Sequence, residues 1–90
     1  MTDGRPRQAV MDRNFLDDLE SWTRIDRRRA LRTLRLVEDV LRDPFDGPGK
    51  PEPLRGQLAG KWSRRIDQEH RLIYQVDDDR VYFLAARHHY

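Results

Sequence analysis

The segment from residue 44 to residue 53, PFDGPGKPEP, constrains the fold of this 90-residue chain more than any other. It contains four of the five prolines and two of the five glycines in the chain. Proline lacks an amide donor and fixes its own backbone, so we expect a loop without regular structure, stiffer than a glycine-serine linker. This loop divides the chain into a part with helical periodicity and a part with the alternation of strands.

Two helices are expected before the loop, after a short strand at residues 9–11. The first begins at an N-cap formed by Asp12 or Asn14, and the second begins after an N-cap at Asp26. The second ends at Asp43, because a residue that precedes proline is pushed out of the α region. The apolar stripe of the first helix is expected to comprise Phe15, Leu16, Leu19 and Trp22. That of the second is expected to comprise Ala30, Leu34, Val37 and Leu41, flanked by Leu31 and Val40.

Four strands are expected after the loop, at residues 54–58, 61–66, 71–76 and 81–87. The last is apolar on both faces, as expected of a central strand. The order β-α-α-β-β-β-β predicts an α+β domain, with two N-terminal helices packed on one face of a mainly antiparallel, twisted sheet. We expect residues 1–8 to form a polar tail and residues 9–90 to form a single domain with a thin core.

Composition excludes several classes of protein. The chain has no cysteine, which rules out disulfides and thiolate zinc sites and fits a reducing cytosol. The longest apolar run, residues 81–86, is far shorter than the ~20 residues that a membrane span needs. The N-terminus has no apolar stretch typical of a signal peptide, so we expect a cytoplasmic protein with no membrane partner.

The net charge of +2 is distributed unevenly along the chain. Residues 1–49 carry ten basic and ten acidic side chains, whereas residues 50–90 carry eight basic and six acidic ones. The basic excess therefore lies in the predicted sheet, where five basic side chains fall within residues 55–71. This local cluster is a candidate surface for RNA or another polyanion.

Glu52 is a candidate catalytic carboxylate. It lies between Pro51 and Pro53, which restrict its backbone on both sides, and a fixed carboxylate is what a general base requires. The alternative is an exposed glutamate in a turn, without a catalytic role.

Arginines at positions 64, 65 and 71 are candidate ligands of a phosphate. Alternation along the strand at 61–66 places Lys61 and Arg65 on one face, and Arg71 begins the next strand across the hairpin. The alternative is a solvated sheet face, whose ion pairs with acidic neighbours would contribute only about 0–1 kcal/mol each.

His88 and His89 resemble metal ligands, but neighbours on a strand point to opposite faces, so we expect no metal site. A single histidine can instead transfer a proton near neutral pH. A carboxylate base, several arginines and a histidine acid are the groups needed to cleave RNA without a metal, because RNA supplies its own 2′-hydroxyl nucleophile. The terminal aromatic, Tyr90, is expected to be held in place.

Three motifs are similar to those of one known family. They are PFxGxGKPEPL at 44–54, LxGxWSRRIxxEHRLxY at 58–74 and RxHY at 87–90. Together they cover nearly all of residues 44–90 and resemble the Txe/YoeB family of toxins within the RelE superfamily. Residues 9–43 resemble the family more weakly, in the lengths of their elements and in Asp17-Asp18 and Trp22.

The resemblance implies a RelE-like fold and a ribosome-dependent mRNA endoribonuclease that cuts mRNA in the A site and inhibits translation. It implies Glu52 as general base, His89 as general acid, Arg71 and Arg65 at the scissile phosphate and Tyr90 as support for the site. Further RNA contacts are expected from Lys50, Arg55, Lys61 and Arg64. No cofactor is expected.

The implied partners are mRNA, the ribosome (the 30S A site and the 70S particle), a YefM-like antitoxin that neutralises the toxin, and a second copy in a homodimer. Two departures concern the site: Arg55 stands where the family often has lysine, and His88 where relatives often have tyrosine. Two histidines therefore compete for the acid role, and the final HY of the family selects His89. A non-catalytic module that binds RNA or the ribosome, and a regulatory co-repressor, remain alternatives.

Overall fold

The computed structural model describes residues 7–87, which form two helices and a five-stranded sheet. The elements are β1 (Gln8–Met11), α1 (Arg13–Ile25), α2 (Arg27–Arg42), β2 (Glu52–Pro53), the 3-10 helix η1 (Gly56–Leu58), β3 (Lys61–Arg65), β4 (Arg71–Val76) and β5 (Arg80–Ala85). The strand order is β1-β5-β4-β3-β2. Among the strands within residues 7–87, only the β1–β5 pair is parallel, so the predicted α+β fold with a mainly antiparallel sheet is confirmed.

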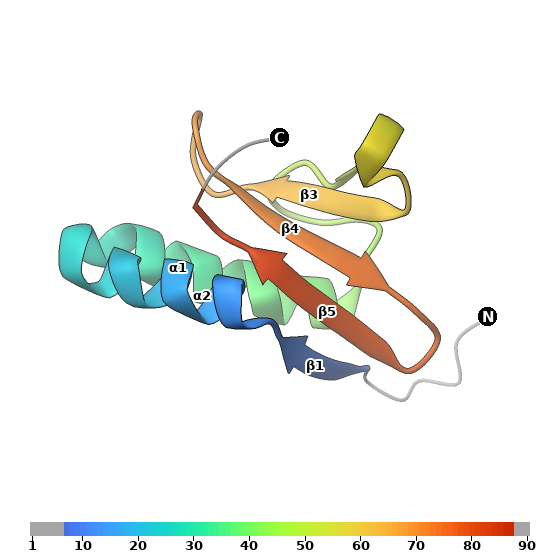
Figure 1. The fold of residues 1–90 in the computed structure, drawn as a ribbon, viewed down its shortest axis with the longest axis horizontal. Helices are drawn as coiled ribbons and strands as arrows, with labels where there is room; N and C mark the ends of the chain where they lie inside the picture. Colours follow the sequence, from blue (N-terminus) through green and yellow to red (C-terminus); the bar gives the residue numbers. More distant parts are fainter. Residues whose placement is uncertain (1–6, 88–90) are drawn as a thin grey trace.

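The two helices lie side by side across one face of the sheet (Figure 1). Their starts match the predicted caps: Asp12 accepts a hydrogen bond from the amide of Asn14 at 3.0 Å, and Asp26 accepts one from Arg28 at 3.0 Å. α2 ends at Arg42, and its C-cap is Asp43, the residue before Pro44. Neither helix is long and apolar enough to span a membrane.

The core lies between the helices and the sheet. Phe15, Leu36, Val40, Tyr74 and Phe83 are among its fully buried members. The predicted apolar stripe of α2 is partly wrong, because the helix is rotated so that Leu36 faces the sheet while Leu34 stays 45% exposed. α1 shows the same kind of difference, with Leu16 43% exposed beside a buried Phe15. Apolar residues on more than one side of each helix left the choice of face to packing.

Several strand boundaries differ from the prediction. The strand expected at 54–58 is absent there: pairing with β3 occurs earlier, at Glu52–Pro53, and η1 follows. The proline-rich loop therefore contains a short strand after all, since Pro53 is tolerated on a sheet edge where no further neighbour needs its missing donor. β3 ends at Arg65, β5 runs from Arg80 to Ala85, and β1 already begins at Gln8, which the prediction assigned to the tail.

The loop between α2 and β2 is held against the helix side of the sheet. Gly49 lies so close to its surroundings that a β-carbon there would be 3.1 Å from Leu36 Cδ2 and 3.1 Å from Arg64 Cβ. Its φ of +89° is also a conformation that favours glycine. The carbonyl of Gly49 accepts a 2.7 Å hydrogen bond from the amide of Arg65, which ties the loop to β3 just before Glu52.

Candidate active site

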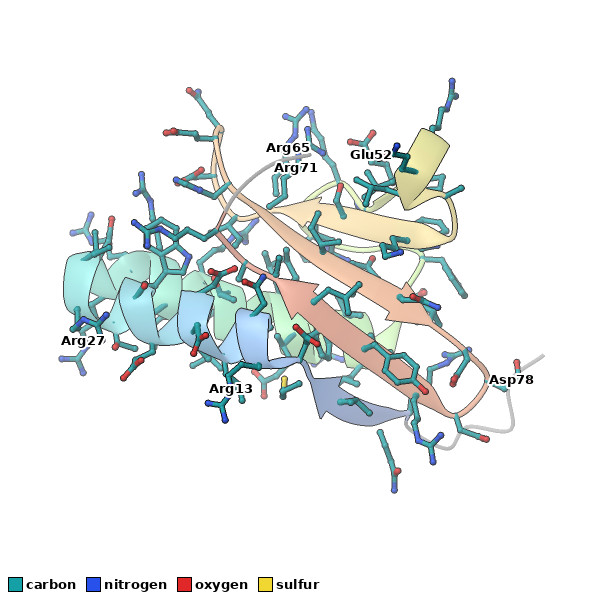
Figure 2. All side chains as sticks on the ribbon, viewed as in Figure 1. Arg13, Arg27, Glu52, Arg65, Arg71 and Asp78 are labelled. Atoms are coloured by element: carbon teal, nitrogen blue, oxygen red, sulfur yellow. The ribbon has the colours of Figure 1, made fainter. Side chains whose placement is uncertain are left out.

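Glu52 and Arg71 meet on the sheet face that the helices leave uncovered. The strand register pairs Glu52 with Ser63 across β2 and β3, and Arg65 with Arg71 across β3 and β4. Paired residues project from the same side of a sheet, and alternation along β3 adds Lys61 to this side. Figure 2 shows the paired Arg65 and Arg71 close together, with Glu52 to one side of them. The structure thus brings together three predicted site residues.

Arg71 is the centre of this group. Its Nη1 donates a 2.6 Å hydrogen bond to Oε1 of Glu52 and a 3.1 Å hydrogen bond to Oγ of Ser63. The Glu52 side chain is 54% exposed and that of Arg71 is 25% exposed. The pair therefore lies at the surface, with Arg71 the more buried of the two. A bound RNA phosphate would therefore find the guanidinium already oriented by two acceptors.

The pKa of Glu52 lies below its ordinary value. The hydrogen bond from Arg71 has the largest effect and lowers the pKa, while partial desolvation opposes it. The positive charges of Arg71, Arg65 and Lys50 lower the pKa further. Glu52 is therefore a carboxylate at neutral pH, which is the state that a general base requires.

Four other predicted RNA contacts remain, and three of them are exposed. The side chain of Arg65 is exposed, but its main chain is held on both sides. Its amide donates a hydrogen bond to the carbonyl of Gly49, and its carbonyl accepts one from Arg32 Nη2 at 3.3 Å. Lys50 and Arg55 are exposed and Lys61 is half-buried. The charges of Arg71, Arg65 and Lys50 act on the Glu52 carboxylate, and Lys61 shares its sheet face, so these four side chains form a positive rim around the carboxylate.

Arg64 does not contribute to that surface, so the prediction that it contacts RNA is wrong. Its side chain is fully buried on the helix side of the sheet, because alternation turns it away from Arg65. The guanidinium donates to Tyr74 Oη at 3.1 Å, to Pro48 O at 3.2 Å and to Asp46 O at 3.0 Å, and also to the carbonyl of Asp43. With all these donors occupied inside the protein, Arg64 is a structural residue that holds the loop before Glu52.

Ser63 is the residue at this site that sequence reasoning missed. It is fully buried, and its hydroxyl accepts from Arg71 beneath the exposed pair. The signal was available in the alternation of β3, where Ser63 shares a face with Lys61 and Arg65. His88, His89 and Tyr90 lie outside the described residues.

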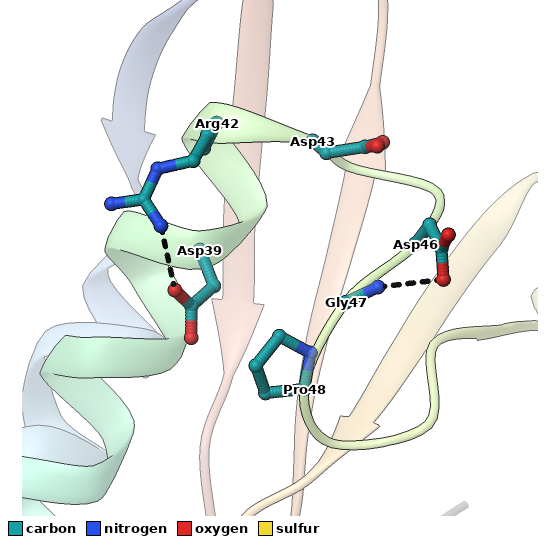
Figure 3. A pocket seen from close by; sticks show the side chains of 6 residues that line it. All are labelled: Asp39, Arg42, Asp43, Asp46, Gly47 and Pro48. Atoms are coloured by element: carbon teal, nitrogen blue, oxygen red, sulfur yellow. Dashed lines mark hydrogen bonds and ion pairs between the residues drawn. The ribbon is translucent and has the colours of Figure 1, made fainter.

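Two hollows elsewhere do not match a phosphate site. One, of about 220 Å³, is lined by Asp39, Arg42, Asp43, Asp46, Gly47 and Pro48 (Figure 3). Arg42 there pairs with Asp39 at 3.5 Å, which leaves an acidic surface that repels phosphate. The other, of about 290 Å³, is lined by Arg29, Asp67, Gln68 and Glu69, and its arginine already pairs with Asp67 at 2.6 Å. Within residues 7–87, no three histidine, aspartate or glutamate side chains are grouped to hold a metal ion.

Comparison with known proteins agrees with this fold and assigns the chain to a family. Residues 11–90 match the family described as YoeB-like toxin of bacterial type II toxin-antitoxin system. The toxin YoeB of Mycobacterium bovis is 51% identical over 84 residues, which cover 93% of this chain and 99% of that protein.

Solved structures show the same architecture. A YoeB/ParE toxin from Agrobacterium tumefaciens has a TM-score of 0.86 and 41% identity, covering 92% of this chain and 99% of its own. YoeB of Staphylococcus aureus, solved as a dimer, has a TM-score of 0.85 and 30% identity, covering 96% and 100%. The same toxin in its heterotetrameric complex with YefM has a TM-score of 0.82, with equal identity and coverage. The chain therefore belongs to the YoeB-like toxins of bacterial type II toxin–antitoxin systems.

Proposed function

We propose that this toxin is a ribosome-dependent endoribonuclease that cleaves mRNA in the ribosomal A site and thereby inhibits translation. The observation that carries the proposal is the anionic Glu52 held by Arg71 beside Arg65, on a sheet face that the helices leave open. A carboxylate base next to two guanidinium groups suits attack at a phosphodiester.

In the proposed reaction, Glu52 accepts the proton of the 2′-hydroxyl at the cut site. The 2′-oxygen forms a bond to phosphorus as the bond to the 5′-oxygen breaks, and His89 gives that oxygen its proton. The products are a 2′,3′-cyclic phosphate and a 5′-hydroxyl. Arg71 and Arg65 stabilise the negative charge that builds on the phosphate oxygens, and Tyr90 supports the site. Because the nucleophile belongs to the RNA, the step needs no metal.

The resting pair between Glu52 and Arg71 must loosen for this step, because a carboxylate bound by a guanidinium is a weaker base. A scissile phosphate competes with Glu52 for Arg71 Nη1, so substrate binding would itself release the base. Ser63 remains as an acceptor for that nitrogen while the exchange occurs. This arrangement fits an enzyme that becomes active only when the ribosome presents the mRNA.

We also propose two partners for this chain. A YefM-like antitoxin is supported by the Staphylococcus aureus relative, which was solved with YefM. An acidic antitoxin segment is the chemistry that the positive rim around Glu52 would bind. A homodimer is supported by the structure of the same relative as a dimer.

The proposal is tested by mRNA cleavage in a reconstituted translation reaction, with wild type, Glu52→Ala, Glu52→Gln and His89→Ala. Loss of a general base or acid should slow cleavage by about 10²–10⁴-fold while ribosome binding is kept. Glu38→Gln, an exposed change on α2, is the matched control and should cut at the wild-type rate. Cleavage that persists when the cut site carries a 2′-deoxy sugar would refute the mechanism. A wild type that binds ribosomes without cutting would favour the non-catalytic binding module.

A further inference from the structure

The chain leaves the sheet at Ala85 and is then held by helix α1. The last residue pair between β4 and β5 is Ile73 with Ala85. At Ala86 the amide donates to Asp18 Oδ2 at 2.9 Å, and the carbonyl accepts from Trp22 Nε1 at 2.7 Å. Both backbone hydrogen-bonding groups of Ala86 are thus satisfied by side chains of one helix instead of by a neighbouring strand.

Two further contacts from α1 lie on either side of the two hydrogen bonds at Ala86. Asn14 Nδ2 donates to the carbonyl of Leu84 at 3.0 Å, and Arg87 Nη1 donates to Ser21 Oγ at 3.3 Å. The Arg87 guanidinium also lies 5.6 Å from the centre of the Trp22 ring. We call the four helix residues the α1 clamp; they are Asn14, Asp18, Ser21 and Trp22. Their spacing places them on one side of α1, which packs against β5.

The clamp is firm because its centre is shielded from water. Ala86 is fully buried and Trp22 is 2% exposed. A buried hydrogen-bonding group that loses its partner costs about 1–3 kcal/mol, and the bond to the Asp18 carboxylate is charge-assisted. The position of the backbone at Ala86 is therefore determined by α1.

We propose that Asp18 and Trp22 are positioning residues for RNA cleavage: by holding Ala86 they fix the end of the described chain, three residues before His89, the proposed general acid. This inference rests on the function proposed above. Three residues of chain span at most about 10 Å, so chain connectivity alone keeps His89 within that distance of Ala86. A general acid must lie within hydrogen-bond reach of its target, and a misplacement of about 1 Å can reduce the rate by about 10²-fold.

A double-mutant cycle separates positioning from simple stabilisation. Asp18→Asn keeps the size of the side chain and removes its charge, and Asp17→Asn makes the same change at the neighbouring, exposed position. Single-turnover cleavage of ribosome-bound mRNA is measured for each in the wild-type and His89→Ala backgrounds. Asp18→Asn should slow cleavage by about tenfold in wild type and by less than about twofold when His89 is absent. Trp22→Phe should follow the same pattern, and Asp17→Asn should have no effect in either background.

Equal losses in both backgrounds would overturn the positioning role and leave Asp18 as a stabilising residue. Hydrogen exchange of the Ala86 amide gives a measurement that is independent of cleavage: exchange should be at least about tenfold faster in Asp18→Asn than in wild type, while the Tyr74 amide in β4 is unchanged. Unchanged exchange at Ala86 would show that the clamp is not what holds this residue. If wild type cuts no mRNA, or if His89→Ala cuts as fast as wild type, the proposed function is wrong, and so is the role of the α1 clamp in cleavage. The hydrogen-exchange result still decides whether the α1 clamp holds Ala86.

Discussion

Arg64 and Arg65 are neighbours in the chain with opposite surroundings. Alternation along β3 sends Arg65 to the open face beside Arg71, and sends Arg64 into the protein beneath the loop that precedes β2. A buried guanidinium is tolerated only when its donors are satisfied, and here three carbonyls and the Tyr74 hydroxyl satisfy them. Tyr74 in turn donates to the carbonyl of Pro44 at 2.7 Å, and burial raises its pKa, so it stays a neutral donor.

Arg64→Lys should therefore lower the free energy of unfolding by about 2–4 kcal/mol, because one ammonium cannot reach all four acceptors and leaves some of them unsatisfied. Arg65→Lys is the matched control and should change stability by less than about 0.5 kcal/mol, since this side chain is exposed. Urea denaturation of both variants measures the difference. Equal stabilities would mean that Arg64 does not support the loop.

Glu52 provides a prediction of pH dependence. Because its pKa is lower in the folded protein than in the unfolded chain, its pairing with Arg71 contributes stability above the ordinary pKa of about 4.3. That contribution is lost as the pH falls through the lowered value. Arg71→Gln removes both the hydrogen bond and the charge, so the pKa of Glu52 should rise.

The pKa of Glu52 can be measured by NMR titration of its side-chain carboxyl carbon, which does not require an active enzyme. Lys61→Gln is the control: it removes one positive charge from the same sheet face without touching the carboxylate, and should shift this pKa less than Arg71→Gln does. An unchanged pKa of Glu52 in Arg71→Gln would contradict the hydrogen bond between Arg71 and Glu52.

At the scale of elements, one aspartate joins the two helices. Asp26 caps the start of α2 through hydrogen bonds from the amides of Arg28 and Arg29, at 3.0 and 3.4 Å. Its own amide donates to the carbonyl of Trp22 at 2.8 Å and closes the end of α1. A single residue therefore terminates one helix and starts the next, which sets the sharp turn between them.

Asp26→Ala should lower the free energy of unfolding by about 1 kcal/mol, the usual cost of losing an N-cap side chain. Asp78→Ala, in the exposed turn between β4 and β5 (Figure 2), removes the same charge where it caps nothing and should be nearly neutral. Thermal unfolding followed by circular dichroism measures both. A destabilisation of similar size in the two variants would point to net charge rather than capping.

At the scale of the whole molecule, charge is nearly balanced. The net charge is only +2, and the positive charges around Glu52 are a local feature of the open sheet face. A protein with so few uncompensated charges should bind free RNA weakly, because phosphate contacts supply most of non-specific affinity. The proposed dependence on the ribosome to present the mRNA is consistent with this balance.

The affinity for a short labelled single-stranded RNA should consequently fall with rising salt. Each lost phosphate contact should reduce the slope of log K against log salt by about 0.7. Lys50→Gln should show this reduction, whereas Arg35→Gln, an exposed change on α2, should leave the slope unchanged. Fluorescence anisotropy over a range of salt concentrations checks both, and identical slopes in the two variants would exclude Lys50 as an RNA contact.

Much of the fold could be predicted because its signals are local. Asp12 and Asp26 cap the helices that begin directly after them, and Pro44 follows the end of α2. The alternating run at 71–76 coincides with β4. The strand expected at 54–58 was wrong because the edge pairing of Glu52 with Ser63 depends on β3, a distant segment. For the same reason periodicity alone placed Leu34 in the apolar stripe of α2 and left out the buried Leu36.

The sequence by itself determined the helix limits, the change of period at the proline-rich loop and, through its motifs, the identity of Glu52, Arg65 and Arg71 as candidates. Only the tertiary structure decided that Arg64 is internal, that Ser63 supports Arg71, and that α1 holds Ala86. Local signals arise from residues within one or two turns of each other. Glu52 and Arg71 are 19 positions apart in the sequence, and Asp18 and Ala86 are 68 positions apart, so these pairs meet only when the sheet and helices pack.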